Sequence, residues 1–399
     1  MSSAIFAQNA TGDVSIPDEL TYLLPIGFTG NRTLGFTATN TSNDTVNSVL
    51  RSAATATFVS YDPEFDEIFG PSPVAQLVAP SSAPYAFEGA VCVPDRNEVW
   101  FSSNVQLGIT NLHVLNLRNN TVRAPSLSGD PVVNPNGGYY FDGLVYFTCI
   151  GNATYASNIV SINPVTGVTE TIVNSYFGTP FYGIDDLTWV KSRSYSKSSE
   201  KEAYMFFTTV SLGGPSAAGG VNETVTVTPQ LPEAVWRFSP SSHLLQPVIS
   251  RADISEPNGI RVNAEMTKLF VTDTPSSLLM RPGQPTSGSP AIFQYDLDDE
   301  GIPLNKRLFG IAAQGIPDGI HIDDDGRVWT GEGNGIVVRN SKGKTIGVIN
   351  KEPLLDERFL NADIAQVALA GDKLVVLAID RLWVIQLRKS IISPGRYQL

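Results

Sequence analysis

Acidic or amide side chains stand at the starts of four copies of a recurring sequence unit. They are Glu88 in FEGAV, Asp185 with Asp186 in GIDDL, Asn258 in EPNGI and Asp318 in IPDGI. Tight turns use Asp, Asn and Gly for backbone reasons alone, so a purely structural role is one interpretation. The other is a cation site, because Ca²⁺ takes carboxylate and amide oxygens, with water completing its shell. Several negative charges at close range would also be costly without a cation between them.

The recurring unit is a strand of alternating apolar residues, a short turn rich in Asp, Gly and Asn, and a second apolar strand. Six copies occur, at residues 89–103, 139–151, 185–209, 258–274, 318–333 and 365–380. A period of about 45 to 75 residues indicates radial repetition of a small four-stranded sheet. Six copies predict an all-β fold, a six-bladed β-propeller. Loops that lead into the first strand of each blade converge at one end of the central channel, so we expect the acidic and amide side chains to meet there.

The sixth copy is followed only by RLWVIQLR (381–388), so the last blade is one strand short. A segment at 56–62 or at 74–80 is predicted to supply the missing strand and close the ring, which removes the exposed edges. We therefore expect a single propeller over residues 51–399. Residues 1–50 are polar and are expected to wrap the outside or to be partly disordered.

Composition limits the partners. The net charge of −12 and the scattered Lys and Arg residues predict no nucleic-acid partner, and the short apolar runs predict no membrane span. A small-molecule partner remains, and the oligomeric state stays open. Cys92 and Cys149 are expected to be buried free thiols rather than a disulfide.

Secretion is predicted from the N-terminal region and the sequons. MSSAIFA resembles the end of a truncated signal peptide. N-x-S/T sequons occur at Asn9, Asn31, Asn40, Asn43, Asn119, Asn152 and Asn222. Glycosylation is predicted at Asn31, Asn40, Asn119, Asn152 and Asn222. Insertions at 211–232 and 275–290 leave from the channel end and are either a lid or plain surface loops.

The segments PNGI…TKLFVTDT and IPDGIHID..GRVW.GEGNGIVVRNSKGKTIGVI resemble the SMP-30/gluconolactonase propeller family, with the best fit to its secreted fungal lactonohydrolases. The likeness runs from residue 58 to residue 349. It implies a propeller with one axial divalent cation, Ca²⁺, and metal-assisted opening of sugar lactones. On this resemblance Glu88, Asp185, Asn258 and Asp318 are the metal ligands. Asp318 is also the base, and Asp186 matches the second residue of an Asn-Asp pair.

Four positions around this site depart from the lactonohydrolase pattern in an apolar direction: Phe87, Tyr182 with Gly183, Thr209 and Ile150. A polyhydroxylated lactone needs a partner for each hydroxyl, since unpaired polar groups cost about 1 to 3 kcal/mol each. The departures favour a fungal hetero-Diels-Alderase of similar fold, which joins a quinone methide to a terpene olefin in secondary metabolism. Such a reaction needs a shaped apolar cavity and few donors.

The predicted lining of that cavity is Phe87, Tyr140, Ile150, Phe177, Phe181 and Thr209. The predicted catalytic residues are Asp318, Asp186, His321 and Tyr182. A structural role for His321, three residues after Asp318, is an equal alternative. The cyclase ranks narrowly above a metal-dependent lactone hydrolase in which Asp318 steers water, and a non-catalytic binding propeller is the third hypothesis.

Overall fold

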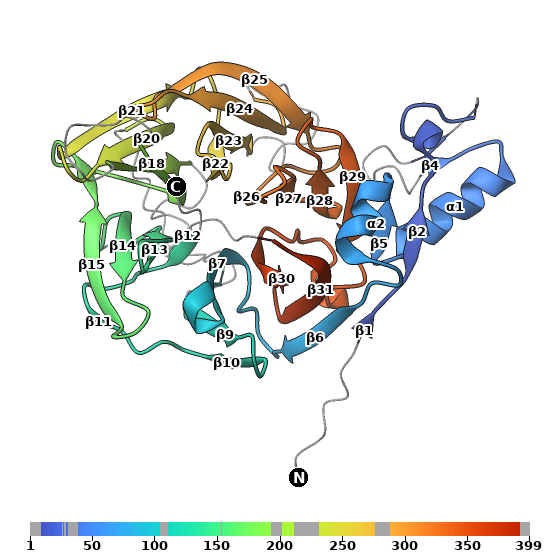
Figure 1. Ribbon diagram of the computed structural model, residues 1–399, viewed down its shortest axis with the longest axis horizontal. Coiled ribbons are helices and arrows are strands. Elements are labelled where there is room, and N and C mark those ends of the chain that lie inside the picture. Colours follow the sequence, from blue (N-terminus) through green and yellow to red (C-terminus); the bar gives the residue numbers. More distant parts are fainter. Residues whose placement is uncertain are drawn as a thin grey trace, which may run out of the picture.

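Six small sheets stand around a central axis, so the prediction of a six-bladed propeller is confirmed (Figure 1). The computed structural model describes residues 9–25, 27, 29–30, 39–103, 111–152, 154–192, 202–210, 231–275 and 288–391. The strands nearest the axis are β7 (Glu88–Val93), β12 (Pro135–Phe141), β18 (Ile184–Lys191), β22 (Pro257–Val262), β26 (Ile320–Ile322) and the first part of β30 (Val367–Ala378).

Hairpins extend each blade outward from its inner strand. Blade one continues with β8 (Glu98–Ser102), β9 (Leu112–Asn116) and β10 (Thr121–Arg123), and blade two with β13 (Leu144–Cys149), β14 (Asn158–Ile162), β15 (Val168–Val173) and a short parallel β11 (Ser128–Gly129). Blade three continues with β19 (Ala203–Thr209), β20 (Ala234–Ser239) and β21 (Leu244–Ser250), and blade four with β23 (Lys268–Asp273), β24 (Ala291–Leu297) and β25 (Pro303–Ile311). Blade five continues with β27 (Val328–Glu332), β28 (Gly335–Arg339) and β29 (Thr345–Asn350).

The hydrophobic core lies between neighbouring blades. Val190 and Phe206 of blade three pack in one cluster with Ile260 and Val271 of blade four. Both faces of each sheet are therefore covered by adjacent sheets, which explains why the inner strands have so few polar residues.

Blade six is closed by an N-terminal strand. β6 (Ala75–Pro80) pairs with β31 (Arg381–Ile391) from Arg381 opposite Pro80 to Ile385 opposite Ala75, and β1 (Asn9–Ala10) pairs outside β6. Of the two segments predicted to close the ring, 74–80 does so. Within β30, Leu377 N donates to Gln366 O (3.3 Å). A fully extended chain from residue 366 to residue 377 would span about 36 Å. Because this hydrogen bond brings its two ends together, β30 must fold back on itself and supply two strands of the blade.

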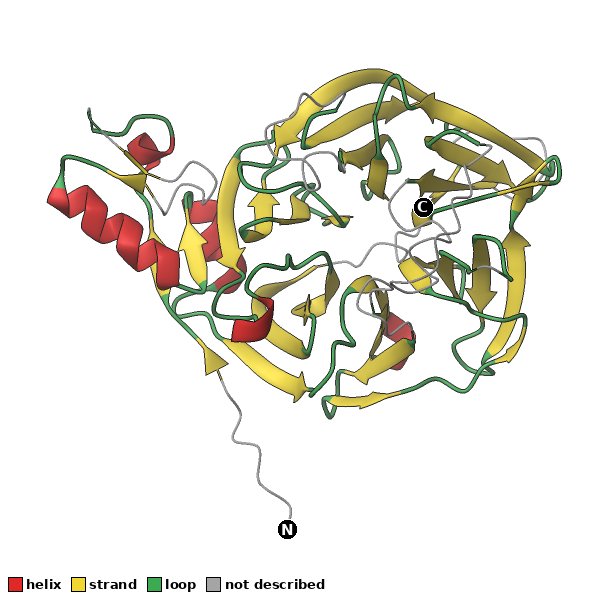
Figure 2. Cartoon of the chain, turned by 180° about the vertical axis from the view of Figure 1, so that it is seen from behind, coloured by secondary structure: helices red, strands yellow, loops and turns green. Residues whose placement is uncertain are grey.

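The other candidate segment extends blade five. β5 (Phe58–Ser60) pairs with β29, and β2 (Asp13–Ser15) runs parallel to β5, so this sheet has six strands. The helices α1 (Asp44–Thr55) and α2 (Pro63–Phe69) accompany these strands, and α1 lies outside the ring (Figure 2). Residues 44–50, expected to be irregular, thus belong to a helix. Two features of the sequence could have predicted this helix. Asn43 is its N-cap, and the Asn43 side chain accepts hydrogen bonds from Thr45 N and Val46 N. The apolar residues Leu50 and Ala53 then lie on its buried face.

The remaining short elements are β3 (Thr29–Gly30), β4 (Thr39–Asn40), β16 (Ser175–Tyr176), β17 (Thr179–Pro180), η1 (Asp18–Thr21), η3 (Pro94–Arg96) and η5 (Glu357–Phe359). Most of the two predicted lid insertions, residues 211–230 and 276–287, lies outside the described residues. In the described part of the chain, no helix has the length and apolar character needed to cross a membrane. Cys92 and Cys149 are buried and unbridged, as expected.

Candidate functional site

The inner strands of blades one to four are bulged where they begin. The register shifts lie between Glu88 and Val91 in β7, between Pro135 and Gly138 in β12, between Ile184 and Leu187 in β18, and between Pro257 and Ile260 in β22. A β-bulge bends its strand and can redirect a side chain. The bulged stretches carry Glu88, Asn136, Asp185 and Asn258. With Asp318, which precedes β26, we call these five the axial residues, and we call this end of the channel the mouth.

Glycines let the axial residues pack closely. A Cβ on Gly89 would lie 2.3 Å from the carbonyl oxygen of Asn136 in the next blade, and one on Gly137 would lie 2.4 Å from that of Asp185. The same holds for Gly259, at 2.5 Å from the carbonyl oxygen of Asp318. Three axial residues, Asn136, Asp185 and Asp318, thus have their backbone against a glycine of the preceding axial stretch. The recurring Glu-Gly and Asn-Gly pairs are needed for this close approach as well as for turning.

Three axial carboxyl groups are close enough to perturb one another. Burial, followed by the charges of Asp318, Asp185 and Asp186, raises the pKa of Glu88 well above its usual range, and the guanidinium of Arg261 opposes this rise. Burial and the charges of Asp318 and Asp186 likewise raise the pKa of Asp185. Glu88, Asp185 and Asp318 are therefore near enough for their charges to interact, and their convergence on one ion remains a prediction.

Asp318 has the clearest shift. Burial raises its pKa to about 7, the neighbouring charge of Asp363 adds to the rise, and a hydrogen bond from the Asn258 side chain opposes it. Such a carboxyl group exchanges protons near neutral pH. That property suits a group that must accept and return a proton.

Asn136 is an axial residue that sequence reasoning missed. Its Nδ2 donates to Asp185 Oδ1 at 2.5 Å, so blade two contributes an amide beside the carboxylate of blade three. The signal was present, because PNG at 135–137 repeats the PNG at 257–259 that contains Asn258.

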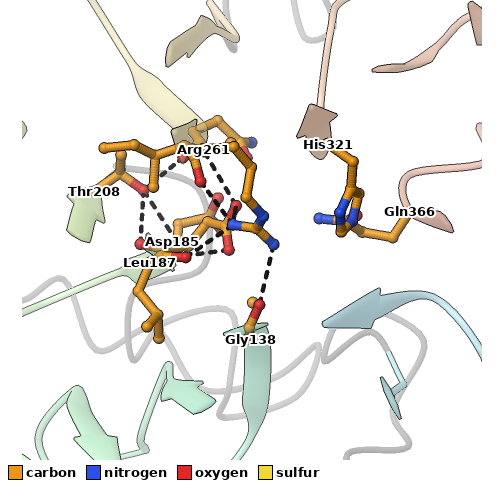
Figure 3. Close-up of polar contacts among 12 residues, drawn as sticks. Gly138, Asp185, Leu187, Thr208, Arg261, His321 and Gln366 are labelled. Atoms are coloured by element: carbon orange, nitrogen blue, oxygen red, sulfur yellow. Dashed lines mark hydrogen bonds and ion pairs between the residues drawn. The ribbon is translucent and has the colours of Figure 1, made fainter. Parts of the chain in front are cut away.

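Asp186 does not occupy the catalytic role predicted for it. Its Oδ2 accepts from Arg261 Nη1 (2.7 Å) and Ile260 N (3.1 Å), and its Oδ1 accepts from Leu187 N (2.8 Å). Arg261 also donates to the carbonyl oxygens of Leu187, Ile260 and Gly138 (Figure 3). Both side chains are almost fully buried. The pair therefore cross-links blades two, three and four below the axial residues, with no free carboxylate oxygen for proton transfer.

His321 faces Arg261 across the channel (Figure 3). Its Nε2 lies 3.2 Å from Gln366 Oε1, and its buried Nδ1 has no hydrogen-bond partner among the described residues. Burial, followed by the charge of Arg261, holds the pKa of the imidazole well below its usual range. A cavity of about 20 Å³, room for one water, is lined by both residues together with Tyr140 and Cys92. His321 is therefore a neutral channel residue, which favours the structural alternative.

Several residues predicted to line an apolar pocket lie elsewhere. Phe181 is fully buried and packs against Phe207 and Trp236 in the core between blades. The Thr209 hydroxyl accepts from Ala234 N (3.0 Å) and so belongs to its own sheet. Periodicity could not separate core-facing from channel-facing positions at the ends of these strands.

The other predicted lining residues are scattered. Ile150 is buried at the end of β13, and the Tyr140 hydroxyl reaches Asp95 (3.4 Å), beyond the far end of β7 from Glu88. Phe87 and Tyr182 are half-buried near the mouth. Phe177 is 92% exposed at the tip of the β16–β17 hairpin. The described residues therefore do not form the continuous apolar wall that was predicted.

A partly buried ion pair, Lys351 with Asp363, was also missed. Lys351 Nζ donates to Asp363 Oδ1 (2.8 Å) and to Ala362 O (2.8 Å), and Lys351 is buried. Asp363 is close enough to Asp318 to raise its pKa. The two residues stand in the connection between blades five and six, after the segment that carries the family likeness.

The sequons have mixed positions. Asn40 and Asn119 are exposed and Asn152 is half-buried, whereas Asn31 and Asn222 lie outside the described residues. The Asn119 and Asn152 side chains each accept a hydrogen bond from the backbone two residues ahead.

The donor set at the mouth fits a hard divalent cation. The described residues hold no ready cluster of three His, Cys, Asp or Glu side chains around one point. The donors are nevertheless all oxygens, from the carboxylates of Glu88, Asp185 and Asp318 and the amides of Asn136 and Asn258. In this arrangement carboxylates repel one another and pair with amides instead. A cation between them would relieve the repulsion that raises their pKa values.

The chain is similar in sequence to known proteins. Residues 219–352 match the SMP-30/Gluconolactonase/LRE-like region, and this confirms the resemblance seen in the sequence. The lactonohydrolases oryL and oryH of Aspergillus oryzae are 27% and 25% identical to the chain. The alignments cover 80% and 88% of this chain and 69% and 82% of the respective relatives. A gluconolactonase of Zymomonas mobilis is 26% identical over 49% of each protein.

Solved structures agree on the fold. A gluconolactonase of Xanthomonas campestris superposes with a TM-score of 0.62 at 19% identity, covering 82% of this chain and 93% of that protein. Regucalcin of Agrobacterium tumefaciens, a calcium-binding protein, gives a TM-score of 0.53 at 15% identity, covering 81% and 98%. At these identities the likeness shows the propeller fold alone.

Proposed function

We propose that the protein is a divalent-cation-dependent hydrolase of small lactones. The observation that carries the proposal is the gathering of axial oxygens at the mouth, where burial and the charge of Asp318 raise the pKa values of Glu88 and Asp185 and the charge of Asp185 also raises that of Glu88. The names of the relatives, two lactonohydrolases and a gluconolactonase, point the same way.

The axial residues have two roles in the proposed reaction, cation binding and proton transfer. Glu88, Asp185, Asn258 and Asp318 would hold the cation, which when bound supplies Lewis-acid polarisation of the lactone carbonyl. An Asp318 carboxylate oxygen accepts a proton from the attacking water while the water oxygen bonds to the carbonyl carbon. As the ring C–O bond breaks, the same proton passes to the departing ring oxygen. Water and lactone together become one hydroxy acid, and Asp318 returns to its starting state.

The hydrolase now ranks above the hetero-Diels-Alderase. The cyclase hypothesis depended on an apolar mouth, and two of its lining residues, Phe181 and Thr209, belong to the packing and hydrogen bonding of the blades. The axial carboxylates, by contrast, have no use in a cycloaddition. Nothing in the relatives' names indicates a cyclase.

The test compares the two reactions on purified protein. A panel of aldonolactones and a quinone methide precursor with a terpene olefin would be assayed with wild type, Asp318→Asn and Asp142→Asn. Asp142 is an exposed turn residue, so the second variant is a matched control. We expect lactone hydrolysis by wild type and by Asp142→Asn, and its loss in Asp318→Asn. A change in cycloaddition products with no lactone turnover would overturn the proposal.

We also propose that the protein enters the secretory pathway and is glycosylated at exposed sequons such as Asn40 and Asn119. A loss of mass after treatment with an endoglycosidase would support this. The loss should be smaller by one glycan in the Asn119→Gln variant. Secreted protein without any glycan would contradict the glycosylation part.

A further inference from the structure

Buried hydroxyl groups on the second strands of blades one to four contact the axial residue of the following blade. Ser102 Oγ donates to the carbonyl oxygen of Asn136 at 3.1 Å, and Thr148 Oγ1 donates to that of Asp185 at 2.5 Å. Thr208 Oγ1 donates to the carbonyl oxygen of Asn258 at 2.6 Å, and Thr272 Oγ1 to that of Asp318 at 2.9 Å. All four hydroxyl-bearing residues are 0% exposed. We call these four residues the hydroxyl clasps.

Two of the clasps also satisfy the bulges that aim the axial residues. Thr208 Oγ1 accepts from Asp186 N (3.1 Å), and Thr272 Oγ1 accepts from Gly259 N (2.8 Å). Each hydroxyl therefore joins the backbone N–H just after one axial residue to the backbone carbonyl of the next. A bulge interrupts the ladder that would otherwise use such groups, and a buried backbone group without a partner is costly.

The pattern is absent from blades five and six, so Glu88 is the one axial residue without a clasp among the described residues. In blade five the Thr330 hydroxyl donates instead to Glu332 Oε1 (2.7 Å) on its own strand, beside Arg339. In blade six the corresponding part of β30 ends in VVLA (375–378), which has no hydroxyl. Clasps thus lead to Asn136, Asp185, Asn258 and Asp318. General packing of blades would not restrict them in this way, because blades five and six are packed as well.

We propose that the four hydroxyl clasps are positioning residues for the cation site: they fix the backbone of four of the five axial residues so that each of these side-chain oxygens points at the axis. The inference rests on the proposed function. Hydrogen bonds that orient metal ligands commonly change metal affinity by about 10- to 100-fold when they are removed. A clasp should therefore affect cation binding more than it affects folding.

The chain supplies a matched control. Thr188 in β18 is 0% exposed, and its hydroxyl has no hydrogen-bond partner among the described residues. Because Thr→Val keeps the side-chain shape, Thr188→Val removes a buried hydroxyl that makes no hydrogen bond to the described residues. Thr208→Val makes the same change on the neighbouring strand, where the hydroxyl links Asp186 N to Asn258 O. Thr208→Ser retains the hydroxyl and serves as the rescue.

The experiment is calorimetric titration of chelator-stripped protein with Ca²⁺, with a thermal melt of each variant in the absence of metal. We expect the Ca²⁺ affinity to fall about 10- to 100-fold in Thr208→Val, and to stay within about twofold of wild type in Thr188→Val and Thr208→Ser. Thr272→Val provides a second clasp if Thr208→Val does not fold, and the same loss is expected there.

The outcomes separate the two proposals. Wild type that binds no Ca²⁺ overturns the metal-dependent function and the clasps together. Wild type that binds Ca²⁺, with unchanged affinity in folded Thr208→Val and Thr272→Val, overturns the clasps alone. Equal loss of affinity in Thr188→Val would also contradict them, because that hydroxyl contacts no axial residue.

Discussion

Removal of the Arg261 guanidinium is expected to destabilise the propeller strongly, because this buried charge is the counter-charge of the buried Asp186 carboxylate. Arg261 and Asp186 are 1% and 2% exposed. In Arg261→Met the Asp186 carboxylate would keep only its backbone donors, Leu187 N and Ile260 N. It would lie near the acidic axial residues without a counter-charge. Breaking a buried ion pair from one side typically costs about 3 to 5 kcal/mol.

The assay is urea unfolding followed by tryptophan fluorescence, with the free energy of unfolding extrapolated to water. Arg237→Met is the matched control, since Arg237 is also buried but donates to the Glu300 carbonyl oxygen and stacks on the Tyr204 ring. We expect a loss of about 3 to 5 kcal/mol for Arg261→Met and about 2 kcal/mol for the control.

The double variant Asp186→Asn/Arg261→Met tests the cause. Because it removes the unpaired carboxylate as well, it should recover about 2 kcal/mol relative to Arg261→Met. Equal losses in Arg261→Met and Arg237→Met, or no recovery in the double variant, would refute the assignment of Arg261 as the buried counter-charge.

Three further predictions concern the mouth and the β16–β17 hairpin. Gly137→Ala would place a Cβ 2.4 Å from Asp185 O, so Ca²⁺ binding measured by calorimetry should be lost, whereas Gly143→Ala, with nothing within 4 Å, should bind normally. Normal binding by Gly137→Ala would contradict the close approach. The Ca²⁺ affinity should fall as the pH drops below about 7, because protonated Asp318 cannot ligate. The metal-free protein should lose stability as the pH rises from about 4 to about 7, since this raised pKa means that the folded state binds the proton more tightly. A flat profile between pH 5 and 8 would argue against both statements. Phe177→Asn should stabilise the protein by about 1 kcal/mol, because Phe177 has φ +48°. It should also raise KM for lactones with apolar substituents if Phe177 contacts substrate, and unchanged KM would exclude that contact.

Much of the fold could be predicted from repetition. The alternating strands and Asp/Gly turns recur six times, and only a closed ring accounts for a last blade that lacks a strand. The choice between 56–62 and 74–80 could not be made, because both are short apolar strands. Both segments pair on the outer side of a blade: β5 pairs with β29 in blade five, and β6 pairs with β31 in blade six.

All the axial residues except Asn136 were predicted because their types and places recur, whereas their surroundings were not. Arg261 follows PNGI as an ordinary strand residue, and only the fold brings it to the Asp186 carboxylate. The same contact removes Asp186 from catalysis. Phe181 and Phe177 are alike in sequence terms, yet one is 0% and the other 92% exposed. Such differences arise from contacts between blades, which a pattern along a single strand does not encode.

The most direct test of a cation-dependent lactone hydrolase is the rate of aldonolactone hydrolysis by chelator-stripped protein as Ca²⁺ is added back. The axial residues Glu88, Asp185, Asn258 and Asp318 predict no hydrolysis above background in the stripped protein, and full restoration at one bound Ca²⁺ per chain. Undiminished hydrolysis by protein shown to contain no metal would contradict the account.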